Sequence, residues 1–128
     1  MSAFKLSNRS IERMTGVHPD LVRVVNEAIK ITPIDFGITC GTRTAAQQRV
    51  LVATGKSQTL NSRHLTGHAV DVVAMIDGKA SWEMKDYKTI ALAFKRAAKS
   101  LGIPIKWGGD FLGFPDGPHF ELDRAKYP

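Results

Sequence analysis

The stretch Ser62-Arg63-His64-Leu65-Thr66-Gly67-His68-Ala69-Val70-Asp71-Val72-Val73 brings two imidazoles and a carboxylate together and then enters a run of β-branched residues. Gly67 and the Val-Asp-Val-Val run predict a loop that enters a strand, rather than a helix with a His-x-x-x-His pair. Because side chains alternate along a strand, Asp71 shares one face with Ala69 and Val73. A carboxylate on such an apolar face needs a cation or hydrogen-bond donors to offset its desolvation.

A metal site at this stretch needs a third ligand, because these residues alone are as consistent with a surface histidine pair and an Asp bonded to backbone amides. The short alternating segment Pro118-His119-Phe120-Glu121-Leu122 offers one. Zinc accepts the donor types of His64, Asp71 and His119, and three protein ligands leave a fourth position for water, as in catalytic sites. Zinc in such a site acidifies that water and polarises a carbonyl group.

A proton acceptor beside the metal would complete a hydrolytic site, and two carboxylates flank His119 in the sequence. Glu121, two residues on, would share the strand face of His119 and be close enough to contact it. Asp116, three residues before, lies in an Asp-Gly-Pro turn that can fold its carboxylate back beside the metal. Asp-Gly is also ordinary turn chemistry, so spacing alone leaves a purely structural role for Asp116 open.

The composition predicts one domain over residues 1–128, with 43% hydrophobic residues to form a single core. The 18 Lys and Arg residues outnumber the 12 Asp and Glu residues and give a net charge of +6. This charge favours an anionic partner, such as nucleic acid, an acidic membrane surface or a cell-wall polymer. The basic residues are spread along the chain without a run of like charge, which argues against a nucleic-acid-binding arm.

Cys40 is the only cysteine, which excludes an intramolecular disulfide and a cysteine-based zinc cluster. Its place in the apolar run Ile38-Thr39-Cys40 predicts a buried, inert thiol. The N-terminal segment has no apolar core of a secretion signal, and no window approaches the roughly 18 apolar residues of a membrane span. We therefore expect the chain in the cytoplasm, without stable membrane insertion.

The remaining patterns predict an α+β fold with a small, mainly antiparallel sheet, flanking helices and the metal on one face of the sheet. The order of the strands in the sheet does not follow from the sequence. Thr44 and Gln47 fit a capping box, Asp86 is a candidate N-cap, and His18 is expected as a surface or capping residue. The expected helices cover residues 20–31, 44–53 and 87–101, and the expected strands cover 34–40, 69–76, 103–107 and 118–122.

The ligand stretch also resembles a known family. Ser62 to Asp71 matches the signature Ser-x-His-x-x-Gly-x-Ala-x-Asp of the zinc D-Ala-D-Ala carboxypeptidase and L-Ala-D-Glu peptidase family. The segment Asp-Gly-Pro-His-Phe-Glu-Leu at 116–122 resembles the second ligand motif, and segments 41–44 and 107–111 resemble flanking blocks. The likeness runs from about Gly37 to Leu122 and is closest to the single-domain bacteriophage endolysins.

This resemblance implies a zinc peptidase that cuts the L-alanyl-D-glutamate bond of peptidoglycan stem peptides during cell lysis. It implies that His64, Asp71 and His119 bind zinc and that Asp116 is the general base. The D-Ala-D-Ala branch of the family typically carries Glu at the position of Asp116, so the aspartate favours the endolysin branch. The fold implied is that of the D-Ala-D-Ala peptidases.

Two further roles follow from the resemblance. Arg43 would stabilise the oxyanion or hold a substrate carboxylate, and Ser62 would orient the ligand loop or the substrate. His68 occupies a variable position of the signature, so we leave it out of the metal set. We expect the His68 ring either to contact one of the metal ligands without binding the metal or to be exposed to solvent.

Two other functions remain open at this point. A D-Ala-D-Ala carboxypeptidase would use the same metal site. A non-catalytic, zinc-stabilised module that binds cell wall or nucleic acid would explain the ligands and the charge but leave Arg43 and Asp116 without a role. The endolysin reading implies peptidoglycan as the partner, no nucleic acid, a monomer as the simplest state, and a holin-like protein that releases the enzyme from the host cytoplasm to the wall.

Overall fold

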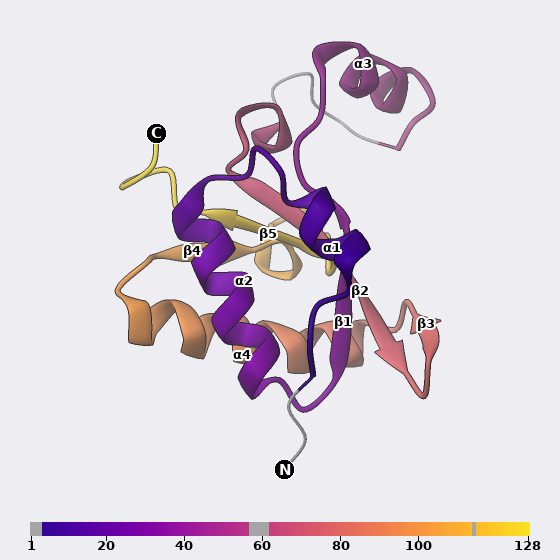
Figure 1. The fold of residues 1–128 in the computed structure, drawn as a ribbon. Helices are drawn as coiled ribbons and strands as arrows, with labels where there is room; N and C mark the ends of the chain where they lie inside the picture. Colours follow the sequence, from indigo (N-terminus) through magenta and orange to yellow (C-terminus); the bar gives the residue numbers. More distant parts are fainter. Residues whose placement is uncertain (1–3, 57–61, 114) are drawn as a thin grey trace.

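The computed structural model describes residues 4–56, 62–113 and 115–128 (Figure 1). Four α-helices and five strands alternate along these ranges, with two short 3-10 helices. The helices are α1 (Asn8–Arg13), α2 (Pro19–Ile31), α3 (Ala45–Ala53) and α4 (Met84–Leu101). The strands are β1 (Asp35–Cys40), β2 (Ala69–Ile76), β3 (Lys79–Ser81), β4 (Ile105–Trp107) and β5 (His119–Leu122), and the 3-10 helices are η1 (Arg63–Thr66) and η2 (Gly108–Asp110).

All strand pairs of the sheet are antiparallel, in the order β1-β2-β5-β4, with β3 paired to the end of β2. β2 and β3 form a hairpin through Asp77 and Gly78, whose φ angles of 51° and 78° suit the tight two-residue turn that Asp-Gly favours. The α+β prediction is confirmed, and its helices flank one small antiparallel sheet.

One face of the sheet is covered by α2 and α4, which pack against it and against each other (Figure 1). Val70, Val72 and Ala74 of β2 point into this core. The ring of Phe94 on α4 stacks on Phe120 of β5, with the ring centroids 3.9 Å apart. Because side chains alternate, the intervening residues of β2 and β5 lie on the opposite face, where a polar site can form.

The helix ends follow the sequence closely. His18 caps α2 by accepting a hydrogen bond from the Asp20 N–H at 3.0 Å, and Pro19 occupies the first helical position. The capping box predicted for α3 is confirmed, since Thr44 and Gln47 exchange side-chain and backbone hydrogen bonds. These contacts fix where the chain enters each helix.

Two predicted boundaries differ from the structure by two or more residues. α4 begins at Met84 with Glu83 as its N-cap, so Asp86 lies inside the first turn and accepts a hydrogen bond from Ser81 Oγ at 2.6 Å. A carboxylate in the first turn also favours the helix dipole, which is why the sequence signal was ambiguous. β4 starts at Ile105 rather than at residue 103, because Pro104 has no N–H for the sheet.

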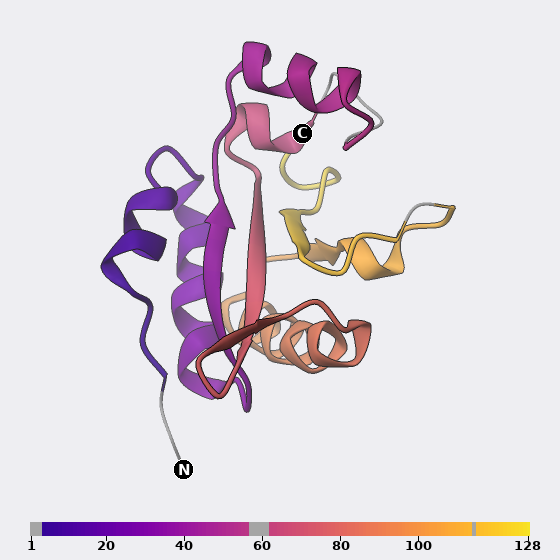
Figure 2. The same cartoon turned by 90° about the vertical axis from the view of Figure 1, so that its right-hand side faces the viewer.

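α3 stands at one end of the sheet, next to η1, and away from the core helices (Figure 2). The candidate ligands come from η1, which lies just below α3 in this view, from β2, and from the start of β5, which lies beside the loop around η2. None of the described helices is long and apolar enough to cross a membrane.

Candidate metal centre and active site

Three side chains predicted as metal ligands converge on the polar face of the sheet. Asp71 Oδ1 lies 3.3 Å from His64 Nε2 and 3.2 Å from His119 Nδ1. Asp71 and His119 are directly opposite each other in the antiparallel pairing of β2 with β5, which fixes their approach. His64 comes from η1, just before β2, so two donors come from adjacent elements of the chain and the third comes from β5, which the sheet places beside β2.

The loop that carries His64 is held by its own sequence. Ser62 caps η1 by accepting a hydrogen bond from the His64 N–H at 3.2 Å. Gly67 ends η1 with a φ of 74°, and a Cβ there would collide with the Gly16 carbonyl oxygen. His18 N–H then donates to the Gly67 carbonyl at 2.8 Å, which ties the loop to the start of α2. The capping contact therefore joins Ser62 to the first turn of η1, which carries His64.

Hydrogen bonds at the far side of each ring determine which nitrogen faces Asp71. His64 Nδ1 donates to the Gly41 carbonyl at 2.6 Å, because a carbonyl can only accept. Its Nε2 therefore carries a lone pair when the ring is neutral, and this atom is buried without a hydrogen-bond partner among the described residues. His119 Nε2 lies 2.8 Å from Glu121 Oε1, which leaves the Nδ1 lone pair toward Asp71.

This arrangement fits a bound cation. Two imidazole lone pairs aimed at a carboxylate oxygen repel it unless a positive charge lies between them. Two donors held 2.0–2.1 Å from a tetrahedral zinc lie about 3.3–3.4 Å apart. The observed separations of 3.3 Å and 3.2 Å match that spacing. The donor types and their tautomers therefore suit a zinc ion held by His64, Asp71 and His119.

Without a metal, protons on the His64 and His119 rings supply the positive charge beside Asp71. Burial disfavours the charged form of both rings, but the Asp71 carboxylate outweighs it and raises the pKa of His64 to about 10 and that of His119 to about 8. Burial also opposes ionisation of Asp71, yet hydrogen bonds from the two rings lower its pKa. The metal-free site is therefore a network of ion pairs at neutral pH.

We expect zinc binding at pH 7 to release protons. The pKa values of His64 and His119 lie above pH 7 in the metal-free protein, at about 10 and about 8, and a metal must displace those protons. Calorimetric titrations in two buffers of different ionisation enthalpy should give a net release of about one to two protons per zinc, falling as the pH rises through these values. Binding without proton release would contradict this protonation state.

Glu121 contacts the candidate ligand His119 on the side of the ring away from Asp71. Burial raises the pKa of Glu121, but the His119 ring and the nearby Arg124 and Arg63 lower it overall, so the carboxylate is charged. A charged carboxylate behind a ligating histidine fixes the tautomer and makes the ring a better donor. The closeness to His119 predicted from the strand spacing is confirmed by the 2.8 Å contact.

Replacing Glu121 with Gln is expected to weaken zinc binding by about 10- to 100-fold, because the amide keeps the shape but loses the charge. Competition with a chelator of known zinc affinity measures this change. Glu27→Gln, on the surface of α2, removes one carboxylate far from the site and is the matched control. Equal zinc affinity in the two variants would show that Glu121 does not act on the metal.

Asp116 lies beside the same centre. Its carboxylate, that of Asp71 and a ring nitrogen of His119 lie within 4.8 Å of one another. The Asp116 N–H donates to the Gly108 carbonyl at 2.8 Å, and Trp107 Nε1 donates to the carbonyl of the next residue, Gly117, at 2.7 Å. Burial and the negative charge of Asp71 raise the pKa of Asp116. A fixed carboxyl group with a raised pKa beside a metal suits a general base.

Arg43 reaches the centre from the loop before α3. Its Nη2 donates to Asp71 Oδ2 at 3.1 Å and its Nη1 donates to Gln48 Oε1 at 3.0 Å. The backbone of Arg43 also donates to the His64 carbonyl at 3.0 Å. Arg43 therefore holds the carboxylate of the candidate ligand Asp71 in addition to lining the cavity, a contact that the sequence did not indicate.

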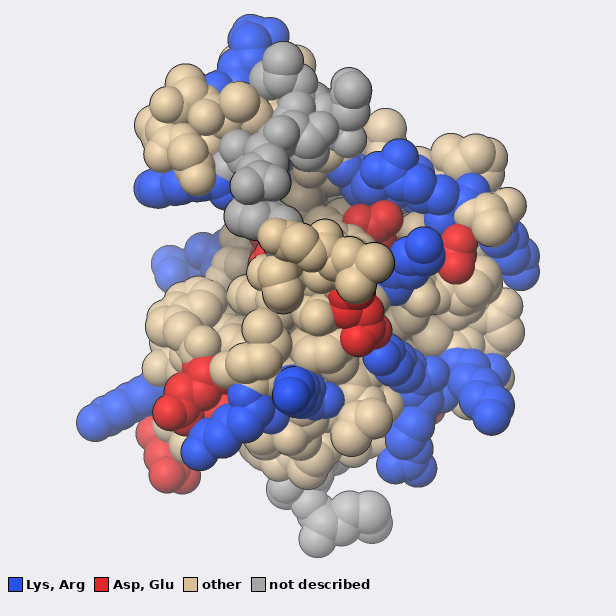
Figure 3. Space-filling model, turned by 180° about the vertical axis from the view of Figure 1, so that it is seen from behind, with Lys and Arg blue, Asp and Glu red and all other residues tan. Residues whose placement is uncertain are grey.

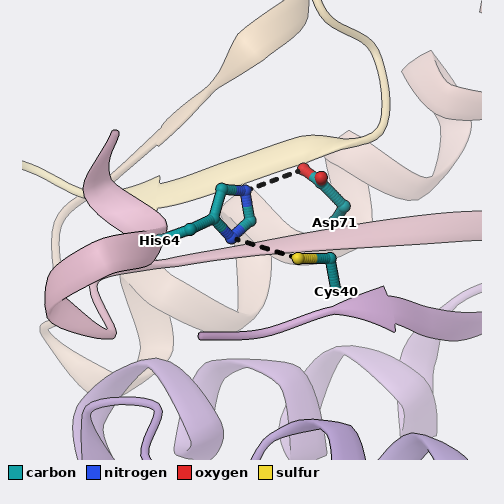
Figure 4. Close-up of side chains that lie close together, drawn as sticks. All are labelled: Cys40, His64 and Asp71. Carbon is teal, nitrogen blue, oxygen red and sulfur yellow. Dashed lines mark hydrogen bonds and ion pairs between the residues drawn. The ribbon is translucent and has the colours of Figure 1, made fainter. Parts of the chain in front are cut away.

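Cys40 was predicted to be buried and inert, and this was wrong in part. It is half-buried, and its Sγ lies 3.8 Å from His64 Nδ1 (Figure 4). Cys40, His64 and Asp71 also form a group that could hold a metal. However, Figure 4 shows the thiol and Asp71 on different nitrogens of the ring, and Nδ1 is already bonded to Gly41. The bulge where β1 leaves its register with β2, between Ile38 and Cys40, brings the thiol here.

Arg63 is a buried residue that the sequence did not single out. Its Nη2 donates to the carbonyls of Leu122 at 3.1 Å and Tyr127 at 2.6 Å. Its Nε lies 3.8 Å from Glu121 Oε2. Arg63 thus joins η1 to β5 and to the segment after it, next to the ligand His64. These partners are 58 or more residues away along the chain, so no local pattern could have indicated them.

His68 lies outside the metal centre. Its Nδ1 contacts Thr66 Oγ1 at 2.6 Å, and its ring is 5.6 Å from that of His18. It is partly buried and does not line the cavity beside the ligands. His68 was not predicted to be one of the metal ligands, and its position away from them is consistent with that.

A cavity of about 680 Å³ opens over the centre. Its wall contains the predicted ligands together with Arg43, Ser62 and Asp116. The cavity is large enough for a peptide segment, with the candidate metal position on its floor.

The positive charge of the surface is distributed. Lys and Arg side chains are spread over the face of the molecule opposite to that in Figure 1, rather than gathered in one patch (Figure 3).

Comparison with known proteins gives a consistent result. The family described as phage L-alanyl-D-glutamate peptidase matches residues 1–124. The L-alanyl-D-glutamate peptidase of Escherichia phage T5 is 34% identical over 129 residues, covering 98% of this chain and 93% of that protein. The peptidase of the same name from Listeria phage A118 is 40% identical over 86 residues, covering 66% of this chain and 29% of that protein. The crystal structure of the Serratia marcescens L-Ala D-Glu endopeptidase ChiX superposes with a TM-score of 0.91 at 50% identity, covering 97% of this chain and 94% of that one.

Proposed function

Because the chain belongs to the phage L-alanyl-D-glutamate peptidase family, we propose that it hydrolyses the L-alanyl-D-glutamate bond of peptidoglycan stem peptides with a zinc ion held by His64, Asp71 and His119. The observation that carries the metal assignment is the convergence of two imidazole nitrogens on Asp71 Oδ1 at 3.3 Å and 3.2 Å. Peptide hydrolysis follows from the family, and the choice of zinc from the donor set.

A zinc ion bound by these residues would acidify a water molecule and polarise the alanyl carbonyl. Asp116 takes a proton from the attacking water and then passes it to the nitrogen of the leaving D-glutamate. The carboxylate is suited to both steps because burial raises its pKa, so it binds and releases a proton nearer to neutral pH.

Arg43 and Ser62 support this chemistry in different ways. One Arg43 nitrogen holds Asp71 in place, and the N–H groups on the cavity side stabilise the oxyanion or a substrate carboxylate. Ser62 orients η1 and with it His64. Residues 1–128 act as one catalytic unit in this proposal.

The positive net charge of the chain suits an anionic substrate. Peptidoglycan stem peptides carry carboxylates, which attract a chain with a net charge of +6. The charge therefore does not require nucleic acid as a partner. We further propose that the enzyme acts as a monomer and reaches the wall from the host cytoplasm after a holin-like partner permeabilises the membrane.

The test is the digestion of a synthetic stem peptide that carries both the L-alanyl-D-glutamate bond and a terminal D-alanyl-D-alanine. Mass spectrometry and amino-terminal labelling identify the products. We expect free L-alanine and a new D-glutamate amino terminus. Release of D-alanine instead would replace the proposal with a carboxypeptidase, and no cleavage of peptide or peptidoglycan with zinc bound would support a binding module.

A further inference from the structure

Positive charge exceeds negative charge on the wall of the cavity formed by β4, β5 and the segment after β5. Glu121 is the carboxylate of this wall, and its Oε2 already has Arg63 Nε at 3.8 Å and Arg124 Nε at 3.9 Å. Lys106 lies opposite Glu121 in the pairing of β4 with β5. Within residues 4–56, 62–113 and 115–128, Lys106 has no ion pair or hydrogen bond. Its charge is therefore available to a ligand.

Lys106 is placed to reach the reacting bond. Because it is paired with Glu121, its side chain projects to the same face of the sheet as Glu121 and His119. Diagonal neighbours across a strand pair are about 7–8 Å apart, and a lysine side chain spans most of that distance. Lys106 and Arg124 both line the cavity together with Asp116 and His119.

Two arginines of the cavity already hold groups of the protein, and Lys56 lines the cavity from the segment after α3 rather than from this wall. Arg43 uses Nη1 and Nη2 for Gln48 and Asp71. Arg63 is buried and bonds to two backbone carbonyls. Arg124, in contrast, has a side chain that is 65% exposed and lies beside Glu121 without a close bond to it. On the wall formed by β4, β5 and the segment after β5, Lys106 and Arg124 are thus the two cations without a close hydrogen bond to the protein.

The substrate of the proposed reaction presents a matching anion. In the stem peptide, D-glutamate is linked onward through its side-chain carboxyl, so its α-carboxylate is free. This group is attached to the same carbon as the scissile nitrogen. Asp116 is proposed to protonate that nitrogen. A cation that binds the α-carboxylate must therefore lie close to Asp116.

We propose that Lys106 and Arg124 form a subsite for the α-carboxylate of D-glutamate, and that the enzyme therefore selects stem peptides with a free carboxylate over those in which it is amidated. This inference rests on the proposed function and adds a substrate class to it. The amide is similar in size but uncharged, so it loses the charge-assisted hydrogen bonds.

The experiment compares two synthetic peptides that differ at one group, L-alanyl-D-isoglutamyl and L-alanyl-D-isoglutaminyl stem peptides. For the zinc-loaded wild-type enzyme we expect kcat/KM to be roughly tenfold higher for the carboxylate peptide. The variants are Lys106→Met, Arg124→Met and the double variant. Lys88→Met, on the exposed side of α4, removes the same charge outside the cavity and is the matched control.

The double variant should lose the preference for the carboxylate peptide. We expect its kcat/KM to fall on the carboxylate peptide alone, mainly because KM rises. The amide peptide should be cut with an unchanged kcat/KM. Lys88→Met should keep the wild-type ratio. A double variant that keeps the ratio would overturn the subsite, as would an equal loss on both peptides or a wild-type enzyme that cuts both equally. Failure of the wild type to cut either peptide or whole peptidoglycan would instead overturn the proposed function.

Discussion

Replacing His64 with alanine is expected to abolish zinc binding and peptidoglycan hydrolysis together. His64 Nε2 is a buried nitrogen without a hydrogen-bond partner among the described residues, 3.3 Å from Asp71 Oδ1. Its removal takes one of three protein ligands from the ion. Since the loss of a group behind a ligand already costs about 10- to 100-fold in affinity, the loss of a ligand should cost more.

The matched control for this experiment lies in the same stretch of sequence. His68→Ala removes an imidazole four residues further on, which contacts Thr66 and His18 rather than the metal centre. It should keep a zinc stoichiometry of about one and most of the activity. Zinc content by elemental analysis and hydrolysis of purified peptidoglycan are the two measurements. Full zinc content in the His64 variant would contradict the ligand assignment.

Replacing Asp116 with asparagine should lower kcat by about 10²- to 10⁴-fold, the usual contribution of a general base. Zinc should remain bound, because Asp116 is not one of the three proposed ligands. Asparagine has nearly the same shape and keeps the backbone bonds to Gly108 and His119, but it does not accept a proton at neutral pH.

Asp110→Asn is the control for the Asp116 variant. Asp110 lies in η2, six residues before Asp116, and is paired with Lys95 at 2.9 Å. Its replacement removes the same charge from the same loop region without touching the centre. The assignment is wrong if Asp116→Asn hydrolyses peptidoglycan at a rate similar to that of Asp110→Asn, measured with equal zinc content.

The sequence was sufficient where the signal is local. The alternation around Asp71 predicted β2 with its observed bounds, Ala69–Ile76. The capping box at Thr44 and the turn at Asp77 and Gly78 depend on contacts within a few residues, and the structure contains both. The donor types alone predicted His64, Asp71 and His119 as a metal set, and the family resemblance supported it, but no local pattern showed that they would meet, because His119 is 48 positions from Asp71.

Contacts between residues far apart in the chain could not be predicted from the sequence. The bond from Arg43 to Asp71 spans 28 positions, and that from Arg63 to Tyr127 spans 64. Both depend on the strand order β1-β2-β5-β4, which places β5 beside β2 although two strands and α4 separate them in the chain. Cys40 was misjudged for a related reason, since an apolar run predicts burial but not the bulge that turns its thiol toward His64.

The most direct test of the account is a digestion of purified peptidoglycan by chelator-treated enzyme, before and after one equivalent of zinc is restored, with the new amino termini identified. The account predicts no cleavage without the metal and recovery of D-glutamate amino termini with it. Cleavage at the same bond by enzyme shown to be free of metal would contradict the assignment of His64, Asp71 and His119 as a catalytic zinc site.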